Sequence, residues 1–196
     1  NNNFIASITS DYRNMINSTA AMLEENTVFS AADAIRQAKN INIFSISSTS
    51  FIAKEFCFKL EMLGFCVKIY TDPLTIALKA SNYSKDDLSV FIVRSIMIKD
   101  IYHAASASKE RGCKNITITS IDSPKLNDLS DYKFIISDKL VADNYVSLSN
   151  NMAYLYVTDV LYGILLKKDK TLLKKKMDSD ALLNSMQAID SRELEY

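Results

Sequence analysis

The fold is decided by the stretch Ile41-Asn42-Ile43-Phe44-Ser45-Ile46, which runs directly into Ser47-Ser48-Thr49-Ser50. Apolar and β-branched residues dominate the first six positions, which is typical of a buried strand. Over residues 51–63 apolar side chains recur at helical spacing, and Gly64 follows where the residue after a helix often adopts a left-handed backbone. This stretch therefore predicts a strand, a hydroxyl-rich loop and a helix.

The alternation of strand and helix continues toward the C-terminus. Asp72 and Pro73 predict the cap and first turn of a short helix, and Gly112 predicts the end of a longer one. Strands and helices that alternate at this spacing form a parallel sheet with right-handed crossovers. We therefore predict a three-layer α/β fold, in which a five-stranded parallel sheet with strand order 2-1-3-4-5 is flanked by helices. The predicted strands are residues 41–46, 66–70, 88–93, 115–119 and 132–137, and the helices between them are residues 51–63, 74–80 and 98–111.

Two further helices are predicted before the sheet and two after it. Residues 4–23 show a loose helical period, and Ser30 predicts the N-cap of a short helix that ends at Ala38. Residues 147–166 predict a long helix, and residues 172–189 predict another. No linker composition separates these parts, so we expect a single domain over residues 1–196. Its parts are N-terminal helices (1–40), a parallel α/β core (41–137) and C-terminal helices (147–196).

The composition excludes several classes of protein. Lys and Arg number 23 and Asp and Glu number 23, so the net charge is zero, which disfavours binding along a nucleic acid. The chain has three glycines, and neither glycine-rich loop of dinucleotide or nucleoside-triphosphate sites occurs. Three cysteines and one histidine show no zinc-site spacing. No metal and no cofactor is therefore expected.

The lengths of the apolar runs indicate the cellular location of the protein. Every run is shorter than the ~20 residues that a membrane span needs, and no signal peptide opens the sequence. We therefore expect a cytoplasmic protein that contacts no membrane, with Cys57, Cys66 and Cys113 as buried, reduced thiols. The chain begins with Asn1 rather than Met, so we expect that an upstream segment is missing.

A ligand site is predicted at one edge of the sheet. Ligands of such sheets bind beyond the carboxyl ends of the strands, here where strands one and three lie side by side. The loops at that place are residues 47–50 and 94–98, and the fourth strand ends on the same side. Hydroxyls before a helix and a guanidinium suit an anion, although Ser and Thr clusters before helices also serve as caps. The candidate ligand-binding residues are Ser47, Ser48, Thr49, Arg94, Ser95, Thr119 and Ser120.

Several motifs resemble those of a known family. The first motif is residues 43–54. The later motifs are Lys59-Leu60, Leu63-Gly64, Lys109-Glu110-Arg111-Gly112-Cys113, Ile116-Thr117-Ile118-Thr119-Ser120, Ser123-Pro124-Lys125-Leu126 and Asn151-Met152-Ala153. Over residues 33–166 the sequence resembles the sugar isomerase (SIS) domain, which has a flavodoxin-like fold. Within that superfamily it is most similar to the effector-sensing domain of RpiR-type bacterial transcriptional regulators.

The resemblance implies a non-catalytic domain that senses a phosphorylated sugar and forms a homodimer or tetramer. It implies contact with DNA only through an upstream helix-turn-helix domain, of which residues 1–40 carry no sign. The family's glycine-rich loop after the first strand is replaced here by Ser45-Ile46-Ser47-Ser48-Thr49, which keeps a hydroxyl at the last place. Its phosphate loop after the third strand is replaced by residues 93–98, which keep only Ser95. Phosphate binding is therefore expected to be modest and to depend on Arg94.

Two other functions stay open from the sequence. A phosphosugar isomerase needs an acid or base, and the candidates Glu55, Glu61 and His103 fall at helix positions typical of exposed side chains. We therefore predict neither isomerisation nor duplex DNA binding by this chain alone. A scaffold that kept the fold after losing its ligand is the other alternative. Lysines between 167 and 176 suit the end of the long helix, and helices 4–23 and 147–166 are predicted to mediate self-association.

Overall fold

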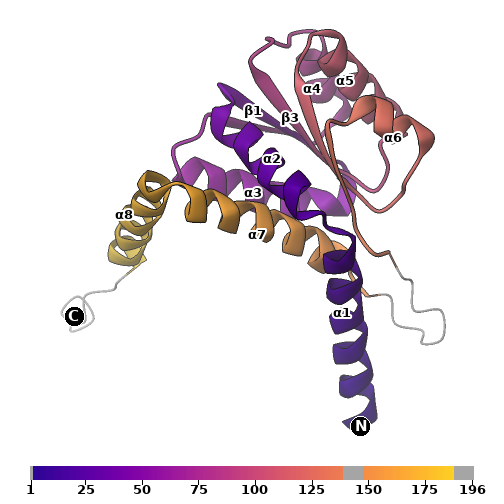
Figure 1. Cartoon of the computed structure of the whole chain (residues 1–196), viewed down its shortest axis with the longest axis vertical. Coiled ribbons are helices and arrows are strands. Elements are labelled where there is room, and N and C mark those ends of the chain that lie inside the picture. Colours follow the sequence, from indigo (N-terminus) through magenta and orange to yellow (C-terminus); the bar gives the residue numbers. More distant parts are fainter. Residues whose placement is uncertain (1, 139–147, 188–196) are drawn as a thin grey trace, which may run out of the picture.

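The computed structural model describes residues 2–138 and 148–187. Within them lies one sheet of five parallel strands in the order β2-β1-β3-β4-β5 (Figure 1). The predicted parallel sheet and its strand order are therefore confirmed. The strands are β1 (Asn40–Phe44), β2 (Val67–Tyr70), β3 (Asp87–Ile92), β4 (Lys114–Thr119) and β5 (Tyr132–Ile135).

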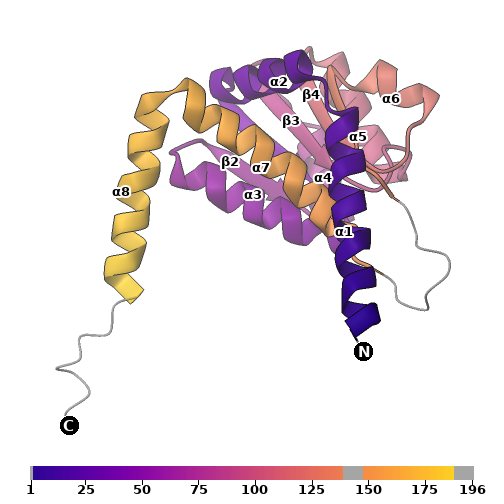
Figure 2. The same ribbon diagram turned by 60° about the horizontal axis from the view of Figure 1, so that its bottom comes forward.

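Helices cover both faces of this sheet, which makes the three predicted layers. One face is covered by α2 (Glu25–Gln37), α3 (Ser50–Met62) and α7 (Asn151–Lys168), and the other by α4 (Pro73–Ala80), α5 (Lys99–Glu110) and α6 (Pro124–Leu129). Two long helices, α1 (Asn2–Met22) and α8 (Lys170–Gln187), project from opposite ends of α7 (Figure 2). Packing therefore joins the N-terminal and C-terminal helices to the same layer.

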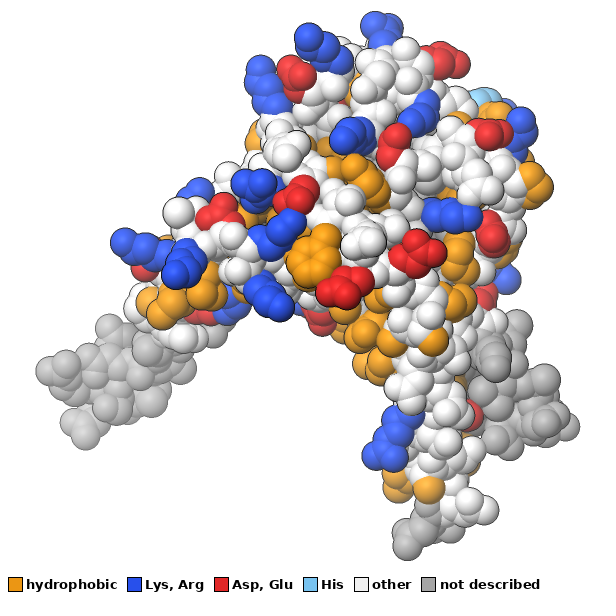
Figure 3. Space-filling view, in the orientation of Figure 1, with side chains coloured by type: hydrophobic (Ala, Val, Ile, Leu, Met, Phe, Trp, Pro, Cys, Tyr) orange, Lys and Arg blue, Asp and Glu red, His pale blue; other side chains and the backbone are white. Residues whose placement is uncertain are grey.

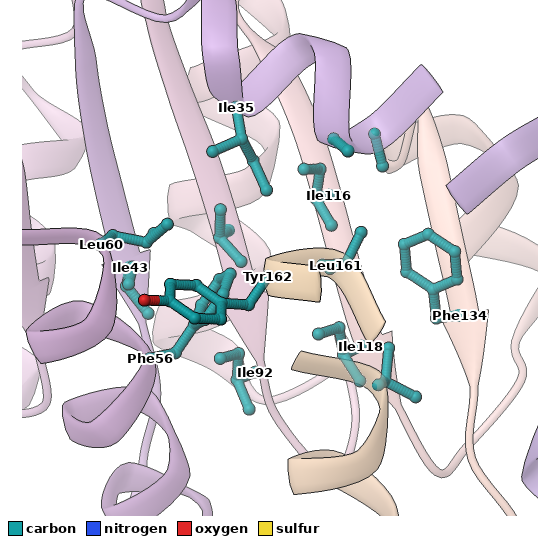
Figure 4. Packing of buried hydrophobic residues seen from close by; sticks show 14 of the residues in the cluster. Ile35, Ile43, Phe56, Leu60, Ile92, Ile116, Ile118, Phe134, Leu161 and Tyr162 are labelled. Carbon is teal, nitrogen blue, oxygen red and sulfur yellow. The ribbon is translucent and has the colours of Figure 1, made fainter. Parts of the chain in front are cut away.

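The core consists of two clusters, because successive side chains of a strand point to opposite faces of the sheet. Ile43, Ile92, Ile116 and Ile118 point toward the layer of α2, α3 and α7, where α7 supplies Leu161 (Figure 4). On the other face a second cluster includes rings of β1 and β3 that stack with their centroids 5.0 Å apart. The strands are therefore buried on both sides, as expected of a helix-covered parallel sheet.

The predicted helix boundaries hold where glycine or a cap determines them. Gly64 and Gly112 adopt left-handed backbone, with φ of +84° and +77°, and their N–H groups donate to Glu61 O and Lys109 O at the ends of α3 and α5. Asp72 caps α4 by accepting a hydrogen bond from Thr75 N at 3.0 Å. These three ends follow local chemistry, so the sequence locates them well.

One helix start was predicted wrongly. The sequence suggested that Ser30 caps a helix after a break at residues 26–27, but α2 begins at Glu25 and Ser30 lies inside it. The break between α1 and α2 lies at residues 23–24 instead, and Val28 N donates to Glu24 O at 3.0 Å. Burial of Val28, Ala31 and Ile35 on one face stabilises the whole helix and outweighs the weak propensity of its first turn.

Other boundaries shift by a few residues or fall outside the described part. β5 ends at Ile135 rather than at residue 137, and α8 starts at Lys170 rather than at residue 172. The long helix α7 begins at Asn151, whereas the predicted start at Ser147 and the predicted end of the last helix at residue 189 lie outside the described residues. Cys57 and Cys113 are buried as predicted, but Cys66 is exposed because it precedes the edge strand β2.

Candidate functional site

A pocket of about 500 Å³ opens at the carboxyl ends of the strands, between the loops that follow β1 and β3. Since β1 and β3 are neighbours, the two predicted loops face each other across it, which confirms their predicted proximity. The N-terminal end of α7 closes a further side. Its lining residues are Ser48, Thr49, Arg94, Ser120, Asp138, Leu148, Ser149, Asn150, Asn151 and Tyr154.

The loop after β1 is held by its own hydroxyls. Ser45 Oγ donates to Ile92 O at 2.7 Å, and Thr49 Oγ1 lies 2.8 Å from Ser45 Oγ and 3.0 Å from Ile46 O. The next residues form a single 3-10 turn, Ser47–Thr49, before α3 begins. Ser47 has φ of +65°, and it is the one non-glycine residue with positive φ in the described ranges. The loop therefore keeps a glycine-like backbone without a glycine, at some cost in strain.

The loop after β3 presents the cation of the pocket. Arg94 is exposed, and its guanidinium forms no ion pair with any described residue. Its carbonyl oxygen accepts hydrogen bonds from Thr119 Oγ1 at 2.7 Å and Ser120 Oγ at 3.3 Å. Ser95 Oγ accepts from Met97 N at 3.1 Å and so shapes the turn. The end of β4 thus fixes the backbone from which the Arg94 side chain extends.

The N-terminal turns of α7 tie both loops together. Asn151 Nδ2 donates to Ser48 O at 3.1 Å, and Tyr154 Oη donates to Val93 O at 3.1 Å. Burial raises the pKa of Tyr154, so this hydroxyl stays protonated at neutral pH and remains a donor. Any ligand that moves one of the loops therefore acts directly on α7.

Sequence reasoning missed the wall that α7 and the end of β5 contribute. Asp138 accepts a hydrogen bond from Asn150 Nδ2, and Leu148 and Ser149 complete this side of the pocket. Asn150 and Asn151 precede a long helix, which is a local sign of a helix start. Nothing local indicates that this helix start meets a loop one hundred residues earlier in the chain.

The seven predicted ligand residues divide into two groups. Four of them form part of the pocket wall, and three lie beside it and shape the loops. Thr119 is fully buried and bonded to the backbone, and Ser95 is engaged in its turn. The wall residues are Ser48, Thr49, Arg94 and Ser120, and the supporting residues are Ser47, Ser95 and Thr119.

The acid or base candidates lie elsewhere. Glu55 is exposed and pairs with Lys59 at 2.9 Å on α3, and none of Glu55, Glu61 and His103 lines the pocket. Cys57 is buried, and burial, assisted by the Glu61 charge, raises the pKa of its thiol to about 11, which disfavours the thiolate at neutral pH. No group of three or more potential metal ligands occurs among residues 2–138 and 148–187. Among the same residues, no helix is long and apolar enough to cross a membrane.

The basic run predicted to end the long helix is divided between two helices. Lys168 ends α7 and pairs with Asp33 of α2 at 2.6 Å, whereas Lys176 lies within α8 and pairs with Asp180. Figure 3 shows lysine and acidic side chains interspersed over this part of the surface. Mixed signs of this kind favour a solvated surface over a phosphate-binding patch.

The fold and the pocket together define an α/β domain with a pocket at the switch point of a parallel sheet. The SIS domain family model matches residues 34–163, so the chain belongs to this family. An HTH-type transcriptional regulator of Clostridium perfringens, itself uncharacterized, is 25% identical over 173 residues. That match covers 87% of this chain and 62% of the regulator, so the chain spans less than two thirds of its length.

The solved structures that are similar to this one include two that cover most of the chain. The Vibrio vulnificus NanR protein, solved with ManNAc-6P, superposes with a TM-score of 0.82 at 18% identity, over 94% of this chain and 70% of that chain. The sugar isomerase domain of the RpiR transcription factor from Sphaerobacter thermophilus gives a TM-score of 0.79 at 17% identity, over 90% and 97%. At these identities the likeness establishes the shared fold.

Proposed function

We propose that this chain is the effector-sensing domain of a cytoplasmic RpiR-type transcriptional regulator, and that it binds a phosphorylated sugar in the pocket between β1 and β3. The observation that carries the proposal is the Arg94 guanidinium, which lines the pocket without an ion-pair partner among the described residues. A guanidinium with several donors suits a phosphate, and the hydroxyls of Ser48 and Ser120 lie in the same pocket wall. The NanR structure with ManNAc-6P supports this class of ligand.

A sensing role needs a path from the pocket to the rest of the molecule. The helix α7 offers one, because its first turns bond both pocket loops and its body packs against α1 and α2. A ligand that brings the loops closer together would therefore shift α7, and with it α1, which packs against α7. This arrangement favours a sensor whose output leaves through the N-terminal side of the chain.

We propose that the output domain is a helix-turn-helix segment ahead of residue 1, so that residues 1–196 form the single SIS domain of a longer protein. The match to a longer HTH-type regulator supports this division. Sequencing of the complete reading frame tests it: a helix-turn-helix upstream is the expected result, and a frame that begins with this domain alone would contradict it.

The proposed domain is non-catalytic. Sugar isomerisation needs a base close to the carbon that loses its proton. Glu55, Glu61 and His103, the acid or base candidates of the sequence, lie outside the pocket wall. Incubation with aldose and ketose phosphates, followed by NMR, should show no interconversion. Turnover that is lost on mutation of Glu55, Glu61 or His103 would favour an isomerase.

Self-association through α1 and α7 also belongs to the proposal. Phe4 lies about 20° from Met15 around α1 at 3.6 residues per turn. Met15 is buried against the body, whereas Phe4 and the adjacent Ile5 are 53% and 69% exposed, so one apolar stripe continues beyond the domain. Met152 adds an exposed apolar side chain on α7. A second copy that covers this stripe would remove an apolar patch from water.

Light scattering tests the assembly with a matched pair of variants. The double change Phe4→Asp and Ile5→Asp should convert a dimer or tetramer to a monomer. The control Ser10→Asp and Asn17→Asp places two charges on exposed positions of the opposite face of α1 and should leave the assembly intact. A wild-type monomer at high micromolar concentration would contradict self-association.

Calorimetry tests the ligand site itself. Sugar phosphates and inorganic phosphate are titrated into the wild type, Arg94→Ala and the control Arg111→Ala, which removes an exposed arginine at the end of α5. Loss of a hydrogen bond to a charged group corresponds to about 1.5–3 kcal/mol, so Arg94→Ala should weaken binding roughly 10- to 150-fold. Thr49→Val should cost only about 0.5–1.5 kcal/mol. Equal affinities of the wild type and Arg94→Ala would show that the ligand binds elsewhere. A complete lack of binding would favour a scaffold.

A further inference from the structure

The pocket is lined by two side chains of opposite charge that form no ion pair with each other. Arg94 enters from the loop after β3, and Asp138 enters from the segment after β5. The two form no ion pair, although both line the same cavity of about 500 Å³. Since β4 lies between β3 and β5 in the sheet, the two charges enter the cavity from strand ends that are two positions apart.

The Asp138 carboxylate has capacity left for a ligand. Its Oδ1 accepts a hydrogen bond from Asn150 Nδ2, and no described residue donates to its other oxygen. The side chain is half-buried, so it retains part of its contact with water and stays available. A carboxylate in this position attracts a hydrogen-bond donor, most strongly a charged one.

Charge balance narrows the ligand further. A phosphate monoester carries close to two negative charges at neutral pH, and Arg94 is the one cationic side chain among the described lining residues. A ligand with a phosphate alone would bring its remaining charge into the same cavity as Asp138, and the two would repel. A ligand that also carries an ammonium group offsets the Asp138 charge, and it forms a charge-assisted hydrogen bond where a neutral sugar offers only hydroxyls.

We propose that the effector is a phosphorylated amino sugar with a free primary amine, bound with its phosphate on Arg94 and its ammonium on Asp138. This inference rests on the proposed phosphosugar site and specifies its chemistry. Ser48 and Ser120 contact the phosphate side of the ligand, and Asn150 orients the Asp138 carboxylate toward the amine.

The test compares three ligands that differ at one position. Glucosamine 6-phosphate carries the ammonium, N-acetylglucosamine 6-phosphate keeps an N–H without the charge, and glucose 6-phosphate carries a hydroxyl. Each is titrated calorimetrically into the wild type, Asp138→Asn and the control Asp128→Asn, which changes an exposed carboxylate on α6. The wild type and the control should bind the amine at least about tenfold more tightly than the other two ligands, a difference of ~1.4 kcal/mol.

The Asp138→Asn variant should lose this preference to within about threefold while it binds glucose 6-phosphate as well as the wild type does or better, because a repulsion has been removed. Equal, Arg94-dependent binding of all three ligands by the wild type would overturn the inference and leave the phosphosugar site standing. A preference for the amine that survives in Asp138→Asn would overturn the role of Asp138. Absence of binding by any phosphate would overturn both the inference and the proposed function.

Discussion

Replacement of Asn115 by alanine should test how the domain holds its second layer of helices. Asn115 lies at the start of β4 and is fully buried. Its Oδ1 accepts from Ser108 Oγ at 2.6 Å, and its Nδ2 donates to Ala105 O at 3.1 Å and to Leu129 O at 2.7 Å. One side chain thus joins β4 to α5 and to the end of α6.

The size of the effect follows from these three hydrogen bonds. Each contributes about 0.5–1.5 kcal/mol net, so Asn115→Ala should lower the free energy of unfolding by about 3 kcal/mol. Ser108 keeps a partner, because its hydroxyl also lies 2.8 Å from Ser89 Oγ, whereas Leu129 O loses the partner that the amide supplied. For a domain of this size the melting temperature should fall by roughly 6–12 °C.

Urea unfolding followed by far-UV circular dichroism measures this loss. The control is Ser130→Ala, which removes a single hydroxyl contact of 2.6 Å to Thr117 and should cost about 1 kcal/mol. A loss for Asn115→Ala that does not exceed the loss for Ser130→Ala would refute the reasoning, because three buried hydrogen bonds would then contribute no more than one.

Three further predictions concern the loop after β1, a buried carboxylate and the hydrogen bond between α7 and the loop after β3. Ser47→Gly should stabilise the domain by up to about 1 kcal/mol in thermal unfolding, because relief of the left-handed backbone exceeds the added entropy of the unfolded chain; a loss would contradict the strain. Burial alone raises the pKa of Asp87, but hydrogen bonds from Lys79 and Asn40 outweigh it and lower that pKa. The stabilisation by this carboxylate is therefore present above about pH 4 and lost as the pH falls through the lowered pKa, and Asp87→Asn should flatten the acid limb of a pH–stability curve; an unchanged limb would contradict this. Tyr154→Phe should cost about 0.5–1.5 kcal/mol in urea unfolding by removing one hydrogen bond while leaving the ring packed; an unchanged free energy of unfolding would show that the bond from Tyr154 to Val93 O does not stabilise the domain.

The sequence by itself determined the sheet, its strand order and several helix ends. Each strand is a short apolar run between two helices, and a chain built in this way buries its apolar surface best as a parallel sheet covered on both faces. Gly64, Gly112 and Asp72 mark helix ends because positive φ and side-chain capping depend on the residue itself. The switch point, and with it the loops that contain Ser48 and Arg94, follow from the topology.

Only the tertiary structure decided which residues close the pocket and where α2 begins. α2 begins five residues before the apparent cap at Ser30, because burial of one whole helix face outweighs a local preference. The contact between Asn151 and Ser48 joins residues 103 positions apart, and Tyr154 reaches Val93 across 61 positions. No local pattern encodes such contacts, because they arise when α7 packs across the sheet and brings its first turn to the strand ends. The same packing brings Asp138 into one cavity with Arg94, which is why the charge on the second side of the pocket was invisible in the sequence.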